Sequence, residues 1–180
     1  MVKKHAASKS KMTTPDVVER RLAELHIIAA RERALRLFAF ASTVYPKEWD
    51  KPFIELAIID LLEFAYHARR VNQLCDIDCT HFPSASRLLV KISEDDPGDW
   101  EDSYHSALNR ILHAKTFVFG SAHSDHRKIF LASEANLVPL YVKISTDKLE
   151  TATISLFGIA ECFLTSAILE IKKKYPDFQF

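Results

Sequence analysis

Apolar residues recur every three or four positions over four long stretches of the chain, which is the spacing of one face of an α-helix. Thr14 followed by Pro15 is a typical helix start, and Pro46 and Pro52 interrupt the pattern between the first two stretches. The pattern predicts helices over residues 15–43, 51–74, 99–114 and 148–174.

Between the last two of these helices the period of the apolar positions falls from about 3.6 to 2. Runs of β-branched and aromatic residues predict short antiparallel strands within 116–145, namely Thr116–Phe119, Lys128–Ala132 and Leu137–Ile144. We expect the first run to end at Gly120 and His123 to His126 to lie in a connecting turn. Pro139 should place the last run at a sheet edge. The predicted fold class is mainly α: a four-helix-bundle-like domain with a small antiparallel β insertion, about 116–145, before the last helix.

The composition predicts one globular domain. The 180 residues are 48% hydrophobic and include only three glycines, so residues 14–176 are long enough to enclose a core. Residues 1–13 carry four lysines and no acid, which is typical of a disordered basic tail.

Charge and cysteine content restrict the function. Lysine plus arginine and aspartate plus glutamate are equal at 24 each, which removes a strong overall positive charge as an argument for nucleic-acid binding, although a local basic face remains possible. Three cysteines favour free thiols in a reducing compartment. Without a signal peptide or a charge-free apolar run of membrane-spanning length, we expect a cytoplasmic protein that has no membrane contact.

The last predicted helix is apolar on most of its sides, with Glu161 as the only charge between Glu150 and Glu170. A helix of this kind is buried centrally or lies in a subunit interface. We therefore expect a homodimer that buries part of it.

The predicted helix 99–114 has one apolar and one polar side. Asp99 is a suitable N-cap, and the apolar side holds Trp100, Tyr104, Ala107, Leu108 and Ile111. The polar side holds Asp102, Ser106, Asn109 and His113. It is a candidate catalytic face, and the alternative is an ordinary solvated face.

A second polar stripe crosses the predicted helix 51–74. Asp60, Glu63, His67 and Arg70 follow one another at intervals of three or four residues and so share a side of the helix. They form either an acid–base or binding constellation, with Glu63, His67 and Arg70 as candidates, or a structural ion ladder.

Two histidine-containing groups suggest a metal only weakly. Cys75, Cys79 and His81 do not have a standard zinc spacing, and His123, Asp125 and His126 lie in a predicted turn. We therefore predict no metal and no cofactor.

The segment Leu108-Asn-Arg-Ile-Leu-His113-Ala114 resembles the motif of the HEPN (higher eukaryote and prokaryote nucleotide-binding) superfamily. Members are helical bundles, commonly dimeric, and many are metal-independent ribonucleases of toxin–antitoxin and defence systems. Asn109 and His113 match the polar residue and the histidine of the motif, whereas Leu108 occupies the position of its arginine and Arg110 lies inside it. Arg21 and His26 give a second literal match, in the first helix.

The resemblance implies a metal-independent endoribonuclease. His113 would be the general acid or base, Asn109 would orient it or hold a phosphate oxygen, and Arg110 or Arg70 would stabilise the phosphate charge. The site would form between two subunits, because one histidine supplies half of an acid–base pair. RNA and a partner protein are then possible partners. The alternative is a non-catalytic dimeric helical module for binding or interaction.

Overall fold

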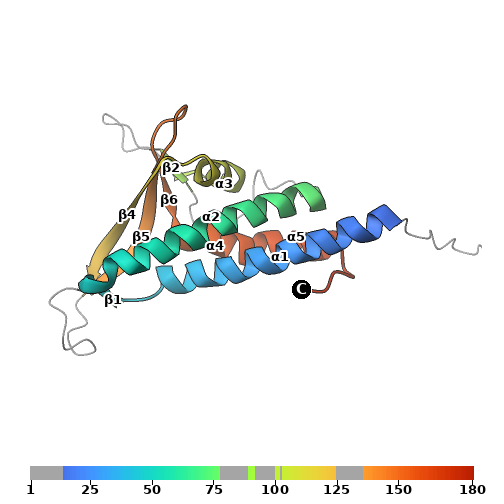
Figure 1. The fold of residues 1–180 in the computed structure, drawn as a ribbon, viewed down its shortest axis with the longest axis horizontal. Coiled ribbons are helices and arrows are strands. Elements are labelled where there is room, and N and C mark those ends of the chain that lie inside the picture. The colour runs from blue at the N-terminus through green and yellow to red at the C-terminus, as the bar shows by residue number, and fades with distance from the viewer. Residues whose placement is uncertain (1–13, 78–88, 92–99, 102, 125–135) are drawn as a thin grey trace, which may run out of the picture.

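A computed structural model of the protein describes residues 14–77, 89–91, 100–101, 103–124 and 136–180 (Figure 1). The predicted tail 1–13 lies outside the described residues. The predicted fold class is confirmed, because the chain is mainly helical and carries a small antiparallel sheet whose strands precede the last helix. Within the described residues, no helix is both long and apolar enough to cross a membrane.

The first two predicted helices are present, and they form a long antiparallel hairpin (Figure 1). α1 spans Thr14–Ala41 and α2 spans Asp50–Cys75, and they are joined by β1 (Tyr45–Pro46) and the short 3-10 helix η1 (Lys47–Trp49). The buried Tyr45 hydroxyl donates a hydrogen bond of 2.7 Å to Asp50 Oδ1 and so ties the connection to the first turn of α2.

The last helix begins later than predicted. It consists of α4 (Leu156–Glu161), the π-helical segment η2 (Cys162–Ala167) and α5 (Ile168–Lys174). Ala152–Ser155, predicted as helix, form strand β6 instead. The reason is that the turn after Thr146 is closed by its own hydroxyl, which accepts a hydrogen bond of 3.0 Å from Leu149 N, and the chain then returns along β5.

Most apolar side chains of this last helix are buried in the core of the same chain. Its fully buried side chains pack with those of α1 and α2 in one core cluster, and the largest of them are Leu156, Ile159, Phe163 and Ile171. The apolar composition therefore does not require a partner subunit. It gives no support to a dimer through this helix.

The third helix, α3, spans Tyr104–Leu112 and is shorter than the predicted 99–114. Trp100 and Glu101, expected in its first turn, form strand β3, which pairs with β2 (Leu89–Lys91). Asp99, the predicted N-cap, lies outside the described residues, and Ser103 takes the N-cap position without a side-chain bond. The apolar side is confirmed, because Tyr104, Ala107, Leu108 and Ile111 are all fully buried.

The sheet is larger than the predicted insertion. β4 spans Thr116–Ser124 and β5 spans Asn136–Ser145, both inside it, but the sheet also includes β1, β2, β3 and β6. β5 is paired along its length with β4 on one side and with β1 and β6 on the other. All these pairs are antiparallel.

Two expectations about the sheet are wrong. β4 continues past Gly120 to Ser124, with a register shift between Gly120 and Ser121, so His123 lies in a strand and not in a turn. Pro139 lies in the central strand, not at an edge. It is tolerated there because it faces Ser121 just past this bulge, between the part of β5 that pairs with β1 and the part that pairs with β6.

Candidate functional site

The polar stripe predicted on α2 lies against α1, and its first half is an ion ladder. Arg33 of α1 bridges two carboxylates, with Nη1 2.7 Å from Asp60 Oδ1 and Nη2 2.6 Å from Glu63 Oε2. Arg36 lies 3.8 Å from Asp60 Oδ1 and 2.6 Å from Glu32. This half of the stripe matches the structural alternative.

The second half brings two histidines together. The Nδ1 atoms of His67 and of His26 on α1 lie 2.8 Å apart, and both side chains are half-buried. A hydrogen bond of this kind needs one ring nitrogen that carries a proton and one that does not, so at least one ring is neutral. Tyr66 packs edge-on against both rings, with centroids 5.9 Å from His26 and 5.1 Å from His67.

The surroundings favour the neutral form of both rings. Burial lowers the pKa of His26, and the charges of His67 and Arg70 lower it further. Burial also lowers the pKa of His67; Glu63 opposes this shift and Arg33 adds to it. The pair is therefore two neutral rings joined by one hydrogen bond, an arrangement in which one ring can take up a proton while the other releases one.

Arg70 supplies a cation beside the pair. Its Nη1 donates a hydrogen bond of 2.9 Å to the neutral side chain of Gln73, and among the described residues it forms no ion pair with a carboxylate. Its positive charge therefore remains available to an anion. The structure thus brings together three candidates from the sequence, Glu63, His67 and Arg70, and adds His26 and Arg33.

The candidates on α3 do not form a common site. Arg110 is buried, and its Nη1 donates a hydrogen bond of 2.6 Å to the carbonyl of Glu150. Asn109 Oδ1 is buried and has no hydrogen-bond partner within the described part of the chain. His113 is exposed at the C-terminal end of the helix. The three residues of the resemblance thus have three different environments.

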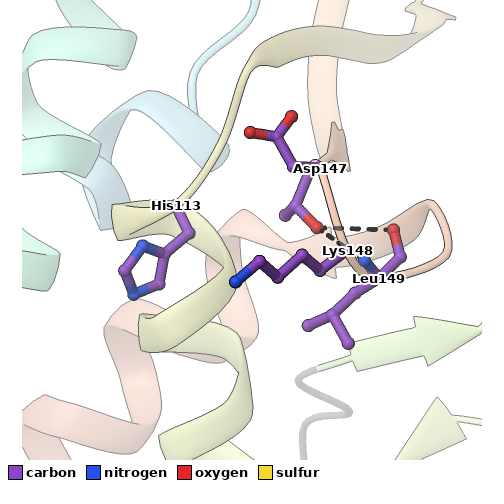
Figure 2. A pocket seen from close by; sticks show the side chains of 5 residues that line it. His113, Asp147, Lys148 and Leu149 are labelled. Carbon is purple, nitrogen blue, oxygen red and sulfur yellow. Dashed lines mark hydrogen bonds between the residues drawn. The ribbon is translucent and has the colours of Figure 1, made fainter.

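His113 lines a pocket of about 390 Å³ together with the turn between β5 and β6 (Figure 2). The other lining residues are Thr146, Asp147, Lys148 and Leu149. Neither Asn109 nor Arg110 belongs to the lining.

The described residues contain no group of three or more histidine, cysteine or acidic side chains that could hold a metal ion. Cys79, His81, Asp125 and His126 lie outside those residues, so the two groups considered from the sequence are not seen complete. Cys75 is buried at the end of α2, and His123 is exposed on β4.

Sequence reasoning did not place His26 and Arg33 in the site. A signal was nevertheless present, because His26 and His67 are equidistant in sequence from the Pro46–Lys47 connection, and so are Arg33 and Asp60. In an antiparallel hairpin, residues equidistant from the connection lie at the same level. Combining this symmetry with the polar stripe of α2 would have found both pairs.

Comparison with known proteins gives no match: no family model, no curated protein and no solved structure resembles this chain at a significant level.

Proposed function

We propose that the chain is a HEPN-like helical protein of a defence or toxin–antitoxin type that cleaves RNA without a metal ion at the histidine pair between α1 and α2. The observation that carries the proposal is the 2.8 Å contact between His26 Nδ1 and His67 Nδ1 on a face that also presents Arg70. In the neutral pair one proton lies between the two Nδ1 atoms, so the donor ring has a free Nε2 and the acceptor ring has an Nε2–H, a base and an acid within one chain. A second subunit is then not needed to complete it.

The mechanism follows from that shared proton. The free Nε2 of the donor ring takes the proton of a ribose 2′-hydroxyl, whose oxygen attacks the neighbouring phosphorus. The donor ring then passes its Nδ1 proton to the acceptor ring, which releases its Nε2 proton to the departing 5′ oxygen. The products are a 2′,3′-cyclic phosphate and a free 5′-hydroxyl. Arg70 stabilises the charge that develops on the phosphate oxygens.

The arginines of the resemblance fit this role less well than Arg70. Arg21 and His26 are five residues apart, about 140° around a helix, and Arg21 pairs with Glu24 at 3.3 Å. Arg110 is buried against Glu150. The resemblance therefore supports the class of activity in this proposal, but Arg70 takes the place of the motif arginine.

The test compares single variants on a single-stranded RNA of mixed sequence. We expect His26→Ala and His67→Ala each to lower cleavage at least about 100-fold, the usual contribution of a general acid or base. His105→Ala is the matched control, because His105 is an exposed histidine on α3, and it should leave the rate unchanged. EDTA should have no effect on cleavage.

The outcomes separate the two candidate sites. Loss of activity in His113→Ala with full activity in His26→Ala and His67→Ala would transfer the site to α3. If the wild-type protein leaves RNA intact, the ribonuclease proposal should be abandoned.

The second candidate is a non-catalytic dimeric module, favoured by exposed apolar side chains around the same histidines. Leu22 and Leu25 on α1 and Ile59 and Tyr66 on α2 are 38%, 50%, 52% and 51% exposed. Leu22 precedes His26 by four residues and Ile59 precedes Glu63 by four, so each lies on the same side of its helix as the polar residue. Elsewhere on the hairpin, α1 packs on α4 and η2, and α2 packs on α3.

The size of this face fits a stable interface. A helix of 28 residues is about 42 Å long, and two packed helices are about 20 Å wide, giving about 800 Å² per partner. In this version the homodimer forms through the α1–α2 face and not through the last helix. A second copy seated there would cover the histidines, so dimerisation and RNA access would compete.

Light scattering distinguishes this candidate. If the face is a dimer interface, Tyr66→Glu should weaken association at least about tenfold, because it buries a charge in an apolar contact. Val118→Glu is the control, since Val118 is 59% exposed on the edge strand β4 and should have no effect. A wild-type monomer at micromolar concentration would exclude the dimeric module without affecting the ribonuclease proposal.

A cytoplasmic location belongs to the same proposal. It is supported by Cys75, a buried free cysteine. The proposed defence or toxin–antitoxin type also implies a protein partner, such as an antitoxin.

A further inference from the structure

The turn that lines the pocket at the end of α3 is fixed at both ends by hydrogen bonds. The turn between β5 and β6 is attached to the α3–β4 connection at its first end, where Lys115 N donates a hydrogen bond of 2.8 Å to Ser145 O and the Lys115 ammonium pairs with Asp147. At its other end, buried Arg110 holds the Glu150 carbonyl. Thr146 Oγ1 closes the turn internally by accepting from Leu149 N. The pocket is therefore preformed.

The charges in the pocket are unbalanced. Asp147 is neutralised by Lys115, and in Figure 2 its carboxylate points away from His113. Lys148 extends toward the His113 ring in the same view, and within the described residues it has no ion-pair partner. The last carbonyls of α3 do not cancel this charge fully, because Asn109 O and Ile111 O accept hydrogen bonds from His113 N and Ala114 N.

We propose that this pocket binds a small organic phosphate, with Lys148 and His113 holding the phosphate group. A phosphate monoester carries a charge of about −1.5 to −2 near neutral pH. A ligand with this charge interacts more strongly with one ammonium and one imidazole than a carboxylate ligand does, because the carboxylate has a smaller negative charge. The volume of about 390 Å³ exceeds what a bare phosphate fills and lies in the range of small-ligand pockets. Leu149 gives the organic part an apolar wall.

This site is separate from the histidine pair between α1 and α2. It also gives His113 and Arg110 roles that differ from catalysis. His113 contacts the ligand, and Arg110 positions the turn that carries Lys148.

Isothermal titration calorimetry with phenyl phosphate tests the proposal, with inorganic phosphate and benzoate as comparison ligands. We expect phenyl phosphate to bind more tightly than either. Lys148→Ala should weaken its binding about tenfold or more, and Lys148→Arg should retain most of it. Lys143→Ala is the matched control, because Lys143 is an exposed lysine on β5, and it should bind as the wild type does.

The source of the phosphate is decided by competition. Failure of a short RNA to displace phenyl phosphate supports a free small phosphate as the ligand, and displacement by the RNA overturns it in favour of a backbone phosphodiester. The proposal is overturned if phenyl phosphate does not bind at millimolar concentration, or if Lys148→Ala binds it as tightly as the wild type.

Discussion

His26 Nδ1 and His67 Nδ1 lie 2.8 Å apart across the contact between α1 and α2. Neither helix brings a carboxylate between the two rings, so the contact depends on one ring donating a proton that the other accepts. When both rings are protonated, two positive charges face each other close to Arg33 and Arg70, which already lower the pKa of His67 and of His26 respectively. The hairpin therefore contains a contact that acid breaks.

The first prediction is that the histidine pair makes the free energy of unfolding depend on pH. Both pKa values are lowered from their ordinary value of 6.5, so below that pH the unfolded chain binds more protons than the folded chain. The contribution of the pair is then fully present above 6.5 and is lost as the pH falls below it. Urea unfolding at a series of pH values between about 7.5 and about 5 measures this loss.

Two glutamine variants test this prediction, one within the histidine pair and one outside it as a control. His67→Gln keeps a hydrogen-bonding side chain but removes a titrating group, so it should flatten the pH dependence, whereas His105→Gln should leave it as in the wild type. An unchanged slope in His67→Gln would show that the pair does not couple protonation to stability.

A second prediction concerns Arg33, the bridge between Asp60 and Glu63. The side chains of Arg33 and Asp60 are 24% and 16% exposed, so removing the cation leaves a poorly solvated carboxylate whose nearest remaining cation is Arg36 at 3.8 Å. Arg33→Met should lower the free energy of unfolding by about 1–3 kcal/mol. Arg31→Met changes an exposed arginine of the same helix and should cost less than about 0.5 kcal/mol in the same urea titration. Equal effects of the two substitutions would contradict the bridging role.

The long helices could be predicted from sequence because each carries its own periodic apolar face and clear breaks. α1 and α2 begin and end within two residues of the predicted bounds. Strands β3 and β6 could not be predicted in the same way. Trp100–Glu101 and Ala152–Ser155 are short segments next to helices, and their strand conformation depends on pairing with β2 and β5, which are distant in sequence.

The sequence predicted some of the residues of the candidate site but not all of them. Glu63, His67 and Arg70 were found because their spacing puts them on one side of a single helix. His26 and Arg33 were not, because their role depends on how α1 lies against α2. The surroundings of Arg110 could not be predicted for a related reason: its spacing does not show the Glu150 carbonyl, which is brought to it by the turn between β5 and β6.

A third prediction concerns Gly120, which pairs with Tyr141 across β4 and β5. A Cβ atom at this position would overlap the Tyr141 ring, so Gly120→Ala forces the ring out of place. Because Tyr141 is half-buried and the overlap is with the far end of its ring, we expect a loss of about 0.5–1.5 kcal/mol in the free energy of unfolding. The double variant Gly120→Ala with Tyr141→Ala should lose less than the sum of the two single variants, because the overlap is then absent. Strict additivity in chemical denaturation would show that the ring does not determine the requirement for glycine.

The last prediction is that Arg110 acts on structure and not on catalysis. Its guanidinium is buried and donates to the Glu150 carbonyl at 2.6 Å, so it connects α3 to the turn that lines the His113 pocket. Arg110→Met keeps much of the apolar stem but leaves that carbonyl without its donor, and should lower the free energy of unfolding by about 1–3 kcal/mol. Arg70→Met, on the surface beside the histidines, should cost less than about 0.5 kcal/mol. RNA cleavage should show the reverse order, with the larger loss in Arg70→Met, because the cation beside the acid–base pair is the one that acts on the phosphate. A folded Arg110→Met protein that is as stable as the wild type but does not cleave RNA would return Arg110 to the active site.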